Sequence, residues 1–579
     1  MDHIGCDGRE TKVMKTRGGD QGDAITALTF PLTYRVVSRA VQQAIAVDDP
    51  SAREYTFQDD LEVICLPNAV QKASDAFDYA CARVGMRANP TKATLTPGRA
   101  VDLQALPSTM QIENRALVLK HGGRVPLPAL PSQTASGSTQ LAERSPEVEH
   151  IAAARTKFFH RLRVLKAAGL PAHTCQSLAR HRTGGDYVYV ARACGIPTTD
   201  AARFDEQLKL AIAQLIGLGP HELDASTAGR LFCTGKDGGL GFQSIATHAP
   251  AAYAASWHTC LPKVITRIGL ASVSALTGAS PWAAQCIPIA SRTLHEATRD
   301  PTVEVGDPNV NASQRLLALA PLAAALDGVR ASLADAPLPA AAFRSSGGRG
   351  AFTWMLPPTE PGHHFTDSQF ATSVRHRLCL PIPSCRGQCQ HRRKNGQICG
   401  AELDQFGTHA RYCAVGGGLV RRHDGARDIL GDWCEEHDCL VQREIILPLA
   451  NAGRPEARMD LIVYTPGAGT PAYIDVSIVS ALSRDALAGG AAKYDGKAAD
   501  IAAAGKRKDY PLIDVTPFIV EDHGRFGDDA VAFLKRVAPA DPAARSRAMR
   551  ELYNRLSCFL QRTAANSLLS AIWGQHAPR

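Results

Sequence analysis

Two short apolar runs, each interrupted by one aspartate, predict a pair of β-strands in the last third of the chain. They cover residues 458–464 and 472–479. Between them stands Pro466-Gly467-Ala468-Gly469, a strong turn signal that should fold the second strand back onto the first. Each strand then contributes one acid, Asp460 or Asp475, at the same end of a small sheet.

The remaining pattern predicts both helices and strands. Helical spacing marks most other segments, and a strand, a tight turn with two acids and a second strand are expected at residues 54–65. The other predicted elements are helices at 28–45 and 67–84, Ala/Leu-rich helices across 146–340, a helical stretch at 485–509, a strand at 512–520, and helices at 528–537 and 543–573. This mixture predicts an α+β protein with several domains.

Composition shifts divide the chain into five predicted segments. A Pro/Ser/Gly-rich stretch separates the first strands from the long helical region, and a glycine-rich stretch at residues 344–350 precedes the cysteines. The predicted domains are residues 1–100, a linker at 101–145, a helical region with a linker at 146–345, a cysteine-rich module at 346–425, and an α/β core with C-terminal helices at 426–579.

The overall composition narrows the class of protein. With 579 residues, 45% of them apolar and 21% charged, the chain is globular and too long for one core. Its net charge of +8 is compatible with a polyanionic partner. No apolar run reaches the ~20 residues of a membrane span, and no apolar signal core follows Met1. We therefore expect an intracellular protein whose 16 cysteines are mostly free thiols.

Four residues have the types and spacing of a zinc site. His409 and Cys413 are separated by three residues, and Cys389 and Cys399 form a second pair across a basic loop. Zinc favours four such ligands in a tetrahedron. Cys385 is an alternative to Cys389, and a set of reduced cysteines in a small core remains the other interpretation.

Cations flank this cysteine and histidine cluster on both sides. Their side chains follow or precede glycines, which leave the backbone open to a phosphate. The candidate nucleic-acid contacts here are Arg392, Arg393, Lys394, Arg421, Arg422 and His423.

The two strand aspartates suggest metal chemistry. Carboxylates that converge repel each other unless a divalent cation neutralises them. A Mg²⁺ or Mn²⁺ ion held there lowers the pKa of a bound water and stabilises charge on a phosphorus centre. Periodicity alone favours the simpler interpretation, in which Asp460 and Asp475 merely cap strands of an α/β sheet.

Three motifs near the start of the chain occur in the order of a polymerase palm. They are Gln21-Gly22-Asp23, then Phe57-Gln58-Asp59-Asp60, then Gly85, Asn89 and Lys92. This order resembles the palm of reverse transcriptases from non-LTR retrotransposons. The resemblance implies that Gln21 and Gly22 position template and nucleotide, that Asp59 and Asp60 hold Mg²⁺, and that Lys92 protonates pyrophosphate.

The match to that family is partial. Ala24 stands where the family usually has proline, and the family's first catalytic aspartate belongs to a strand well upstream of the Gln-Gly-Asp motif. Only twenty residues precede Gln21. We expect an N-terminally truncated copy with a partial palm, and a two-metal site without one bridging carboxylate should not polymerise alone.

The C-terminal motifs resemble a second part of the same elements. The cysteine/histidine cluster, the Arg-His pair and the two aspartates are similar to the restriction-like endonuclease of site-specific non-LTR elements, a relative of PD-(D/E)XK nucleases. The resemblance implies that Asp460 and Asp475 bind Mg²⁺, that a lysine orients the attacking water, and that Glu444 holds a second metal or a water. Met459 replaces the usual proline, and Ser477 stands where a lysine is common. The candidate lysines are Lys493, Lys497, Lys506 and Lys508, of which Lys506 is favoured.

These resemblances imply a retrotransposon protein that nicks DNA for target-primed reverse transcription. Its expected partners are a DNA target and the element's RNA, with no membrane and no small-molecule substrate, and its expected location is the nucleus. The alternative is a catalytically inactive remnant that still binds nucleic acid through the zinc module.

Overall fold

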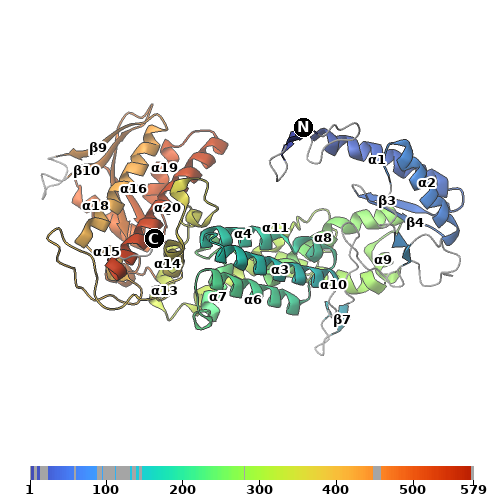
Figure 1. Cartoon of the computed structure of the whole chain (residues 1–579), viewed down its shortest axis with the longest axis horizontal. Coiled ribbons are helices and arrows are strands. Elements are labelled where there is room, and N and C mark those ends of the chain that lie inside the picture. The colour runs from blue at the N-terminus through green and yellow to red at the C-terminus, as the bar shows by residue number, and fades with distance from the viewer. Residues whose placement is uncertain are drawn as a thin grey trace. The chain divides into compact units, whose positions relative to one another are not determined.

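The computed structural model divides the chain into two compact units, residues 1–127 and 128–579 (Figure 1). It describes residues 2–4, 10–12, 24–57, 60–87, 94–95, 111–112, 131–133, 139–141, 146–279, 281–447 and 458–574. The units are described separately below. Helices and one larger sheet occur together, so the protein is of the α+β type that the sequence predicts.

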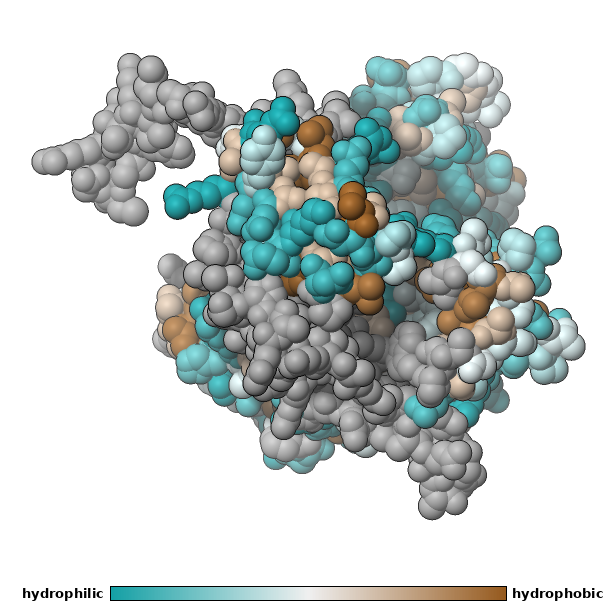
Figure 2. Space-filling model, turned by 90° about the vertical axis from the view of Figure 1, so that its right-hand side faces the viewer, coloured by the Kyte–Doolittle hydropathy of each residue, from teal (hydrophilic) through white to brown (hydrophobic). Residues whose placement is uncertain are grey.

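The first unit contains the predicted order of helix, hairpin and helix. Its elements are β1 (Asp2–Ile4), β2 (Glu10–Lys12), α1 (Ala24–Ile45), β3 (Arg53–Phe57), β4 (Asp60–Ile64), α2 (Val70–Arg83), β5 (Thr94–Leu95) and β6 (Gln111–Ile112). β3 and β4 pair antiparallel, as the sequence predicts. Val41 and Ile45 of α1 pack with Ala69 and Ala73 at the start of α2. Among the residues coloured in Figure 2, most on the face shown are hydrophilic, with separate groups of apolar residues.

The second unit begins with a two-stranded ribbon and a helical region. Its elements are β7 (Pro131–Gln133), β8 (Thr139–Leu141), α3 (Pro146–Ala167), α4 (Ala172–Gly185), α5 (Val188–Ala193), α6 (Thr198–Leu215), α7 (Ala225–Phe232), α8 (Ile245–Ile268), α9 (Val273–Ala279), α10 (Pro281–Thr298), α11 (Gln314–Leu317), α12 (Leu319–Ser332) and α13 (Pro337–Ser345). The predicted Ala/Leu-rich helices are confirmed. They enclose three apolar clusters, centred on α4 with α6, on α8 with α10, and on α5 with α6.

A four-stranded sheet organises the C-terminal part. Its strands are β9 (Leu440–Ile446), β10 (Arg458–Tyr464), β11 (Ala472–Val479) and β12 (Val515–Glu521). The order is β12-β11-β10-β9, with β11 and β12 parallel and the other pairs antiparallel. The accompanying helices are α14 (Asp367–Arg377), α15 (Thr408–Tyr412), α16 (Gly418–Glu435), α17 (Arg484–Ala488), α18 (Lys497–Asp509), α19 (Asp528–Val537) and α20 (Pro542–Trp573). The strands predicted at 458–464 and 472–479 have the predicted bounds.

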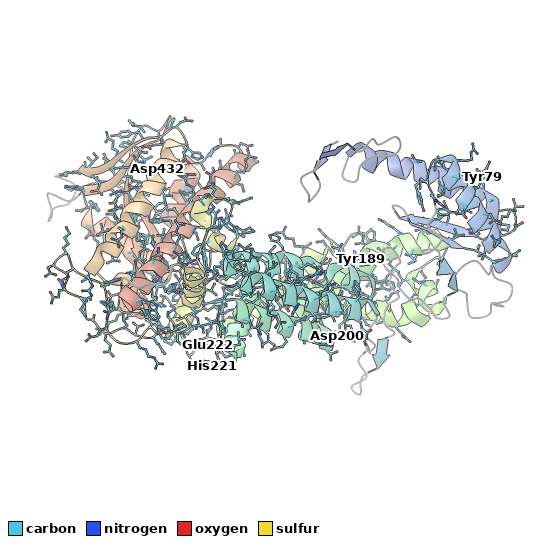
Figure 3. The ribbon with its side chains drawn as sticks, viewed as in Figure 1. Tyr79, Tyr189, Asp200, His221, Glu222 and Asp432 are labelled. Atoms are coloured by element: carbon cyan, nitrogen blue, oxygen red, sulfur yellow. The ribbon has the colours of Figure 1, made fainter. Side chains whose placement is uncertain are left out.

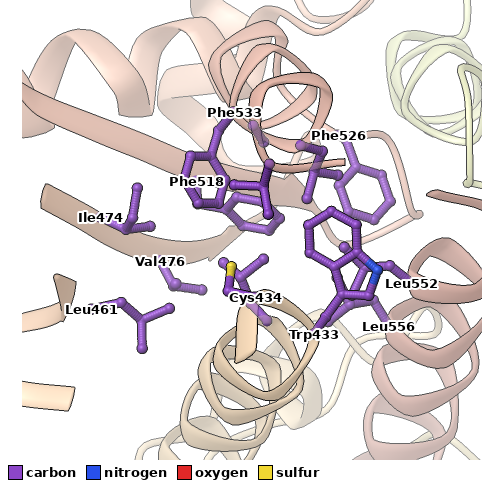
Figure 4. Close-up of a cluster of buried hydrophobic side chains, with 14 of the residues drawn as sticks. Trp433, Cys434, Leu461, Ile474, Val476, Phe518, Phe526, Phe533, Leu552 and Leu556 are labelled. Carbon is purple, nitrogen blue, oxygen red and sulfur yellow. The ribbon is translucent and has the colours of Figure 1, made fainter. Parts of the chain in front are cut away.

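Helices cover both faces of this sheet. Alternate residues of the strands, including Val476 and Phe518, pack with α16, α19 and α20 in the largest apolar cluster (Figure 4). Ile519 points to the opposite face, where it meets Ala499 and Ala503 of α18. Successive side chains of a strand alternate between faces, so the sheet is buried from both sides.

A glycine sets how closely two of these helices approach. A Cβ atom on Gly425 of α16 would lie 2.1 Å from the ring of Phe559 on α20. Backbone and aromatic ring therefore touch directly at this crossing. Any larger residue at position 425 would move α16 away from α20.

Buried arginines tie the helical region to α14. The guanidinium of Arg377 donates to the carbonyl oxygens of Gly235 and Gly239, at 3.1 Å each, and of Ala351 at 3.0 Å. Arg375 forms an ion pair with Glu222 at 2.6 Å (Figure 3 labels Glu222). Burial lowers the pKa of Arg377 to about 9, so the side chain remains a cation at neutral pH. The turn predicted at residues 236–241 is held by these bonds.

Among the described residues, no helix is both long and apolar enough to cross a membrane. The longest, α20, has 32 residues. Several of its positions are charged, which a bilayer core would disfavour.

Substituting Trp433 by alanine should strongly destabilise the sheet. The indole is fully buried in the largest cluster, and its Nε1 donates to the carbonyl of Ala548 at 3.2 Å. Removing a buried Trp costs about 3–5 kcal/mol. Urea unfolding followed by circular dichroism measures the loss, and Val420→Ala at a 62% exposed position of the same helix is the control. Equal stabilities of the two variants would contradict this packing.

Candidate functional sites

A short hairpin and a short helix bring the four predicted zinc ligands together. The hairpin pairs Gln388 with Glu402 and Arg392 with Ile398, which places Cys389 next to Cys399. Helix α15 and its C-terminal cap supply His409 and Cys413. A Cβ on Gly407, the residue before α15, would lie 2.6 Å from Leu568 of α20, so this helix starts in close contact with α20.

The ligand atoms of the four residues lie within 4.8 Å of one another. The sulfurs of Cys389 and Cys413 are 3.9 Å apart, and the Cys399 sulfur is 3.4 Å from Nε2 of His409. Three thiols and one imidazole in this arrangement are compatible with a structural zinc site. Burial raises the pKa of Cys389 to about 12, so ionisation of this thiol requires a compensating cation.

The structure separates Cys389 from its alternative. The Cys385 sulfur lies 3.2 Å from the carbonyl oxygen of Asp404 and belongs to the apolar packing around the cluster. The four-residue group contains Cys389 and not Cys385. Nearby His391 is held by α20, because its Nε2 lies 2.9 Å from the carbonyl oxygen of Ser567.

The predicted phosphate contacts have different environments. Arg392, Arg393, Lys394 and Arg421 are exposed, as a nucleic-acid contact requires. For Arg422 the prediction is wrong. Its guanidinium is buried, donates to the carbonyl of Arg411 at 3.2 Å and lies 5.2 Å from the centre of the Tyr412 ring. Neighbouring residues on a helix point about 100° apart, so Arg421 faces outward while Arg422 faces the core.

The two predicted catalytic aspartates lie on neighbouring strands. The printed pairing of β10 with β11 ends at Leu461 and Ile474, the residues next to Asp460 and Asp475. Both aspartates are buried, at 9% and 5% exposure. The backbone N–H of Val476 donates to the Asp460 carboxylate, so this carboxylate reaches β11 one residue beyond Asp475. Two buried carboxylates therefore lie on adjacent strands of a largely apolar sheet.

Each carboxylate has a basic partner from a different helix. Nζ of Lys506 on α18 lies 2.7 Å from Oδ1 of Asp475. Nε2 of His423 on α16 lies 3.2 Å from Oδ2 of Asp460, and this oxygen also accepts the backbone N–H of Val476 at 2.7 Å. Of the four candidate lysines, Lys506 is thus the one beside an aspartate of the pair. His423, predicted as a phosphate contact, lies at the candidate metal site instead.

The electrostatics of the pair follow from burial and proximity. Burial raises the pKa of Asp475, and the charge of Asp460 adds to this, while Lys506 and a hydrogen bond from Tyr510 oppose it. The hydrogen bond to Asp460 raises the pKa of His423 to about 9, so this imidazole is a cation at neutral pH. Sequence reasoning missed Tyr510, although it lies four residues after Lys506 and therefore near it at the helix end.

The third predicted acid, Glu444, lies on β9 next to this pair. The register places it opposite Asp460, between the pairs Arg443–Leu461 and Ile445–Met459. Its carboxylate is in contact with Arg427 of α16 and forms a 3.5 Å ion pair with Arg458. Its φ of +56° marks a local distortion of the edge strand. Glu444 is thus adjacent to the carboxylate pair but engaged by two arginines.

Within the described ranges, the only other close group of possible metal ligands is His376, Asp522 and His523. Both carboxylate oxygens of Asp522 already accept hydrogen bonds. Its Oδ1 accepts from Nδ1 of His523 at 2.7 Å, its Oδ2 accepts from the Tyr412 hydroxyl at 2.8 Å, and Arg411 lies 3.8 Å away. A second cation here would be repelled by Arg411. The group is a buried polar junction between α14, α15 and β12.

The predicted polymerase residues cannot be placed in the same way. Gln21, Gly22, Asp59 and Lys92 lie outside the described residues. Asp60 is the first residue of β4, at the tip of the β3–β4 hairpin. The antiparallel pairing of β3 with β4 agrees with the predicted hairpin, and the polymerase roles remain predictions.

Comparison with known proteins adds no assignment. No protein-family model matches the chain, and no curated protein matches it.

Replacing Cys389 by serine should remove bound metal, whereas replacing Cys385 by serine should not. Both thiols are buried, but Cys389 alone of the two belongs to the four-ligand group. Structural zinc contributes folding free energy directly, so Cys389→Ser should also lower the thermal midpoint. Elemental analysis of purified protein measures zinc per chain. Equal zinc content in the two variants would exclude this ligand set.

Proposed function

We propose that the chain is a metal-dependent DNA-nicking endonuclease of the restriction-like type, joined to a partial reverse-transcriptase palm and a zinc module. The observation that carries this proposal is the Asp460–Asp475 pair with Lys506 at 2.7 Å from Asp475. Two carboxylates on the inner strands of a four-stranded sheet and a lysine beside them are the groups that such a reaction needs. The proposal extends to target-primed reverse transcription by a complete relative at the exposed 3′ hydroxyl.

The donor set suits a hard divalent cation. Mg²⁺ is commonly bound through one or two carboxylates together with waters and phosphate oxygens. Asp460 and Asp475 would hold it. Burial and the charge of Asp460 both raise the pKa of Asp475, so a bound cation would stabilise the ionised form of this carboxylate. When bound, Mg²⁺ or Mn²⁺ would supply a water of lowered pKa and stabilise charge on the scissile phosphate.

The chain's own residues supply position and charge. Lys506 is placed to orient the attacking water and to offset negative charge on the phosphate. The N–H of Val476 fixes one oxygen of Asp460, which limits the carboxylate to one orientation. His423 places a second positive charge on the opposite side of the pair from Lys506, since the two come from α16 and α18.

Nucleic acid is the proposed partner of the zinc module. Arg392, Arg393 and Lys394 project from the tip of the ligand hairpin, and Arg421 starts the helix that carries His423. One α-helix thus joins a basic exposed end to the carboxylate pair. Backbone phosphates bound by these cations would run toward Asp460. The proposed location is the nucleus, where such a DNA target resides.

Plasmid nicking tests this function. Supercoiled DNA incubated with the full chain and Mg²⁺ or Mn²⁺ should become open circular. Asp460→Ala and Asp475→Ala should each slow nicking by about 10²–10³-fold or more, as for loss of one group that stabilises developing charge. Asp327→Ala, which removes a 74% exposed carboxylate on α12, is the matched control.

The outcomes separate the enzyme from an inactive remnant. Nicking that disappears in both aspartate variants and persists in Asp327→Ala supports the endonuclease. DNA binding without nicking by the unaltered chain, at any concentration of either metal, would instead identify a nucleic-acid-binding remnant. Nicking of equal rate in all variants would show that it comes from a contaminant.

A further inference from the structure

A second acid at the end of β12 holds the helix that carries Lys506. Glu521 is the last residue of β12 and is 1% exposed. Its Oε1 accepts the backbone N–H of Ala499 at 3.1 Å. Ala499 is the third residue of α18, and the first N–H groups of a helix have no partner within the helix. Glu521 therefore caps α18 from a neighbouring strand.

This helix has few other anchors. Its own cap residue, Gly496, supplies no side-chain bond, and the buried residues of α18 are the small side chains of Ala498, Ala499 and Ala503. Alanine contacts bury little apolar area. A carboxylate at the positive end of the helix dipole is correspondingly important for where the helix starts.

The other end of the same helix presents the lysine of the candidate site. Lys506 is in the last turn of α18, and its Nζ reaches Asp475 on β11. β11 and β12 are neighbours, and Glu521 pairs with Val479 of β11. The helix is thus fixed at both ends to the same two-strand unit, by Glu521 at the start and by Lys506 at the end.

We propose that Glu521 is a positioning residue that sets the register of α18 and so places Lys506 against Asp475. Its importance for cleavage rests on the endonuclease function proposed above. The position of Lys506 itself is a separate matter that can be measured without cleavage.

Because Glu521 is buried, two replacements of similar size can separate its role as an acceptor from its volume. Burial raises the pKa of Glu521, while a hydrogen bond from Ser345, the Ala499 amide and Arg525 lower it. Glutamine keeps an acceptor oxygen at the same place, whereas methionine has similar volume and no acceptor. Glu521→Met therefore removes the cap and leaves the Ala499 N–H without this acceptor. Unchanged hydrogen exchange of β10 and β11 shows that the chain stays folded in this variant.

The first experiment measures the helix and the lysine directly in the metal-free full chain. Hydrogen exchange of residues 497–509 should be faster in Glu521→Met than in Glu521→Gln, with exchange of β10 and β11 unchanged. Acylation of Lys506, relative to exposed Lys508 on the same helix, should rise in Glu521→Met and stay at the parent value in Glu521→Gln. Unchanged exchange and acylation in Glu521→Met would overturn the proposal, as would a Glu521→Gln variant that behaves like Glu521→Met.

The second experiment links position to cleavage by a double-mutant cycle. At saturating Mg²⁺, Glu521→Met should slow nicking in the parent but add no further loss in a Lys506→Ala chain, because the two residues act through one contact. Additive losses would show that Glu521 acts otherwise, for example on global stability. If the parent does not nick at all, the proposed function fails, while exchange and acylation still decide the positioning role.

Discussion

Two buried carboxylates on neighbouring strands repel each other, and in the C-terminal part of the chain each of them has a basic partner. Neighbouring strands bring Asp460 and Asp475 together, and burial removes the water that would screen them. Helices on opposite faces then deliver one basic side chain to each acid, His423 from α16 and Lys506 from α18. The helices on the two faces of the sheet thus supply one positive charge to each buried acid.

The zinc-type cluster and the carboxylate pair are connected through the backbone. Cys413 ends α15, three glycines follow, and α16 then runs to His423. On the same short helix α15, Tyr412 donates to Asp522, the residue next to Glu521. The cysteine/histidine module and α18 therefore both contact the C-terminal end of β12, through Asp522 and Glu521 respectively. Unfolding of the cysteine/histidine cluster would therefore perturb both α16 and α18, the helices that contact the two aspartates.

Local sequence signals predicted the elements well but not which polar residues meet. The strands at 458–464 and 472–479 are confirmed because their apolar runs end at strong turn residues. The choice of Lys506 agrees with its contact to Asp475. Arg422 was predicted wrongly and Glu521 was missed because their contacts depend on packing between elements far apart in sequence, such as the 22 residues that separate Glu521 from Ala499. The preference for Cys389 over Cys385 likewise depends on the hairpin that pairs 388 with 402.

Gly425 gives the crossing of α16 and α20 an unexpected importance. It lies two residues after His423, and its backbone rests against the Phe559 ring with no room for a methyl group. The depth at which α16 sits therefore determines how far the imidazole reaches toward Asp460. The combined side-chain volume at positions 425 and 559 therefore bears on the contact between His423 and Asp460, which lies two residues along α16 from this crossing.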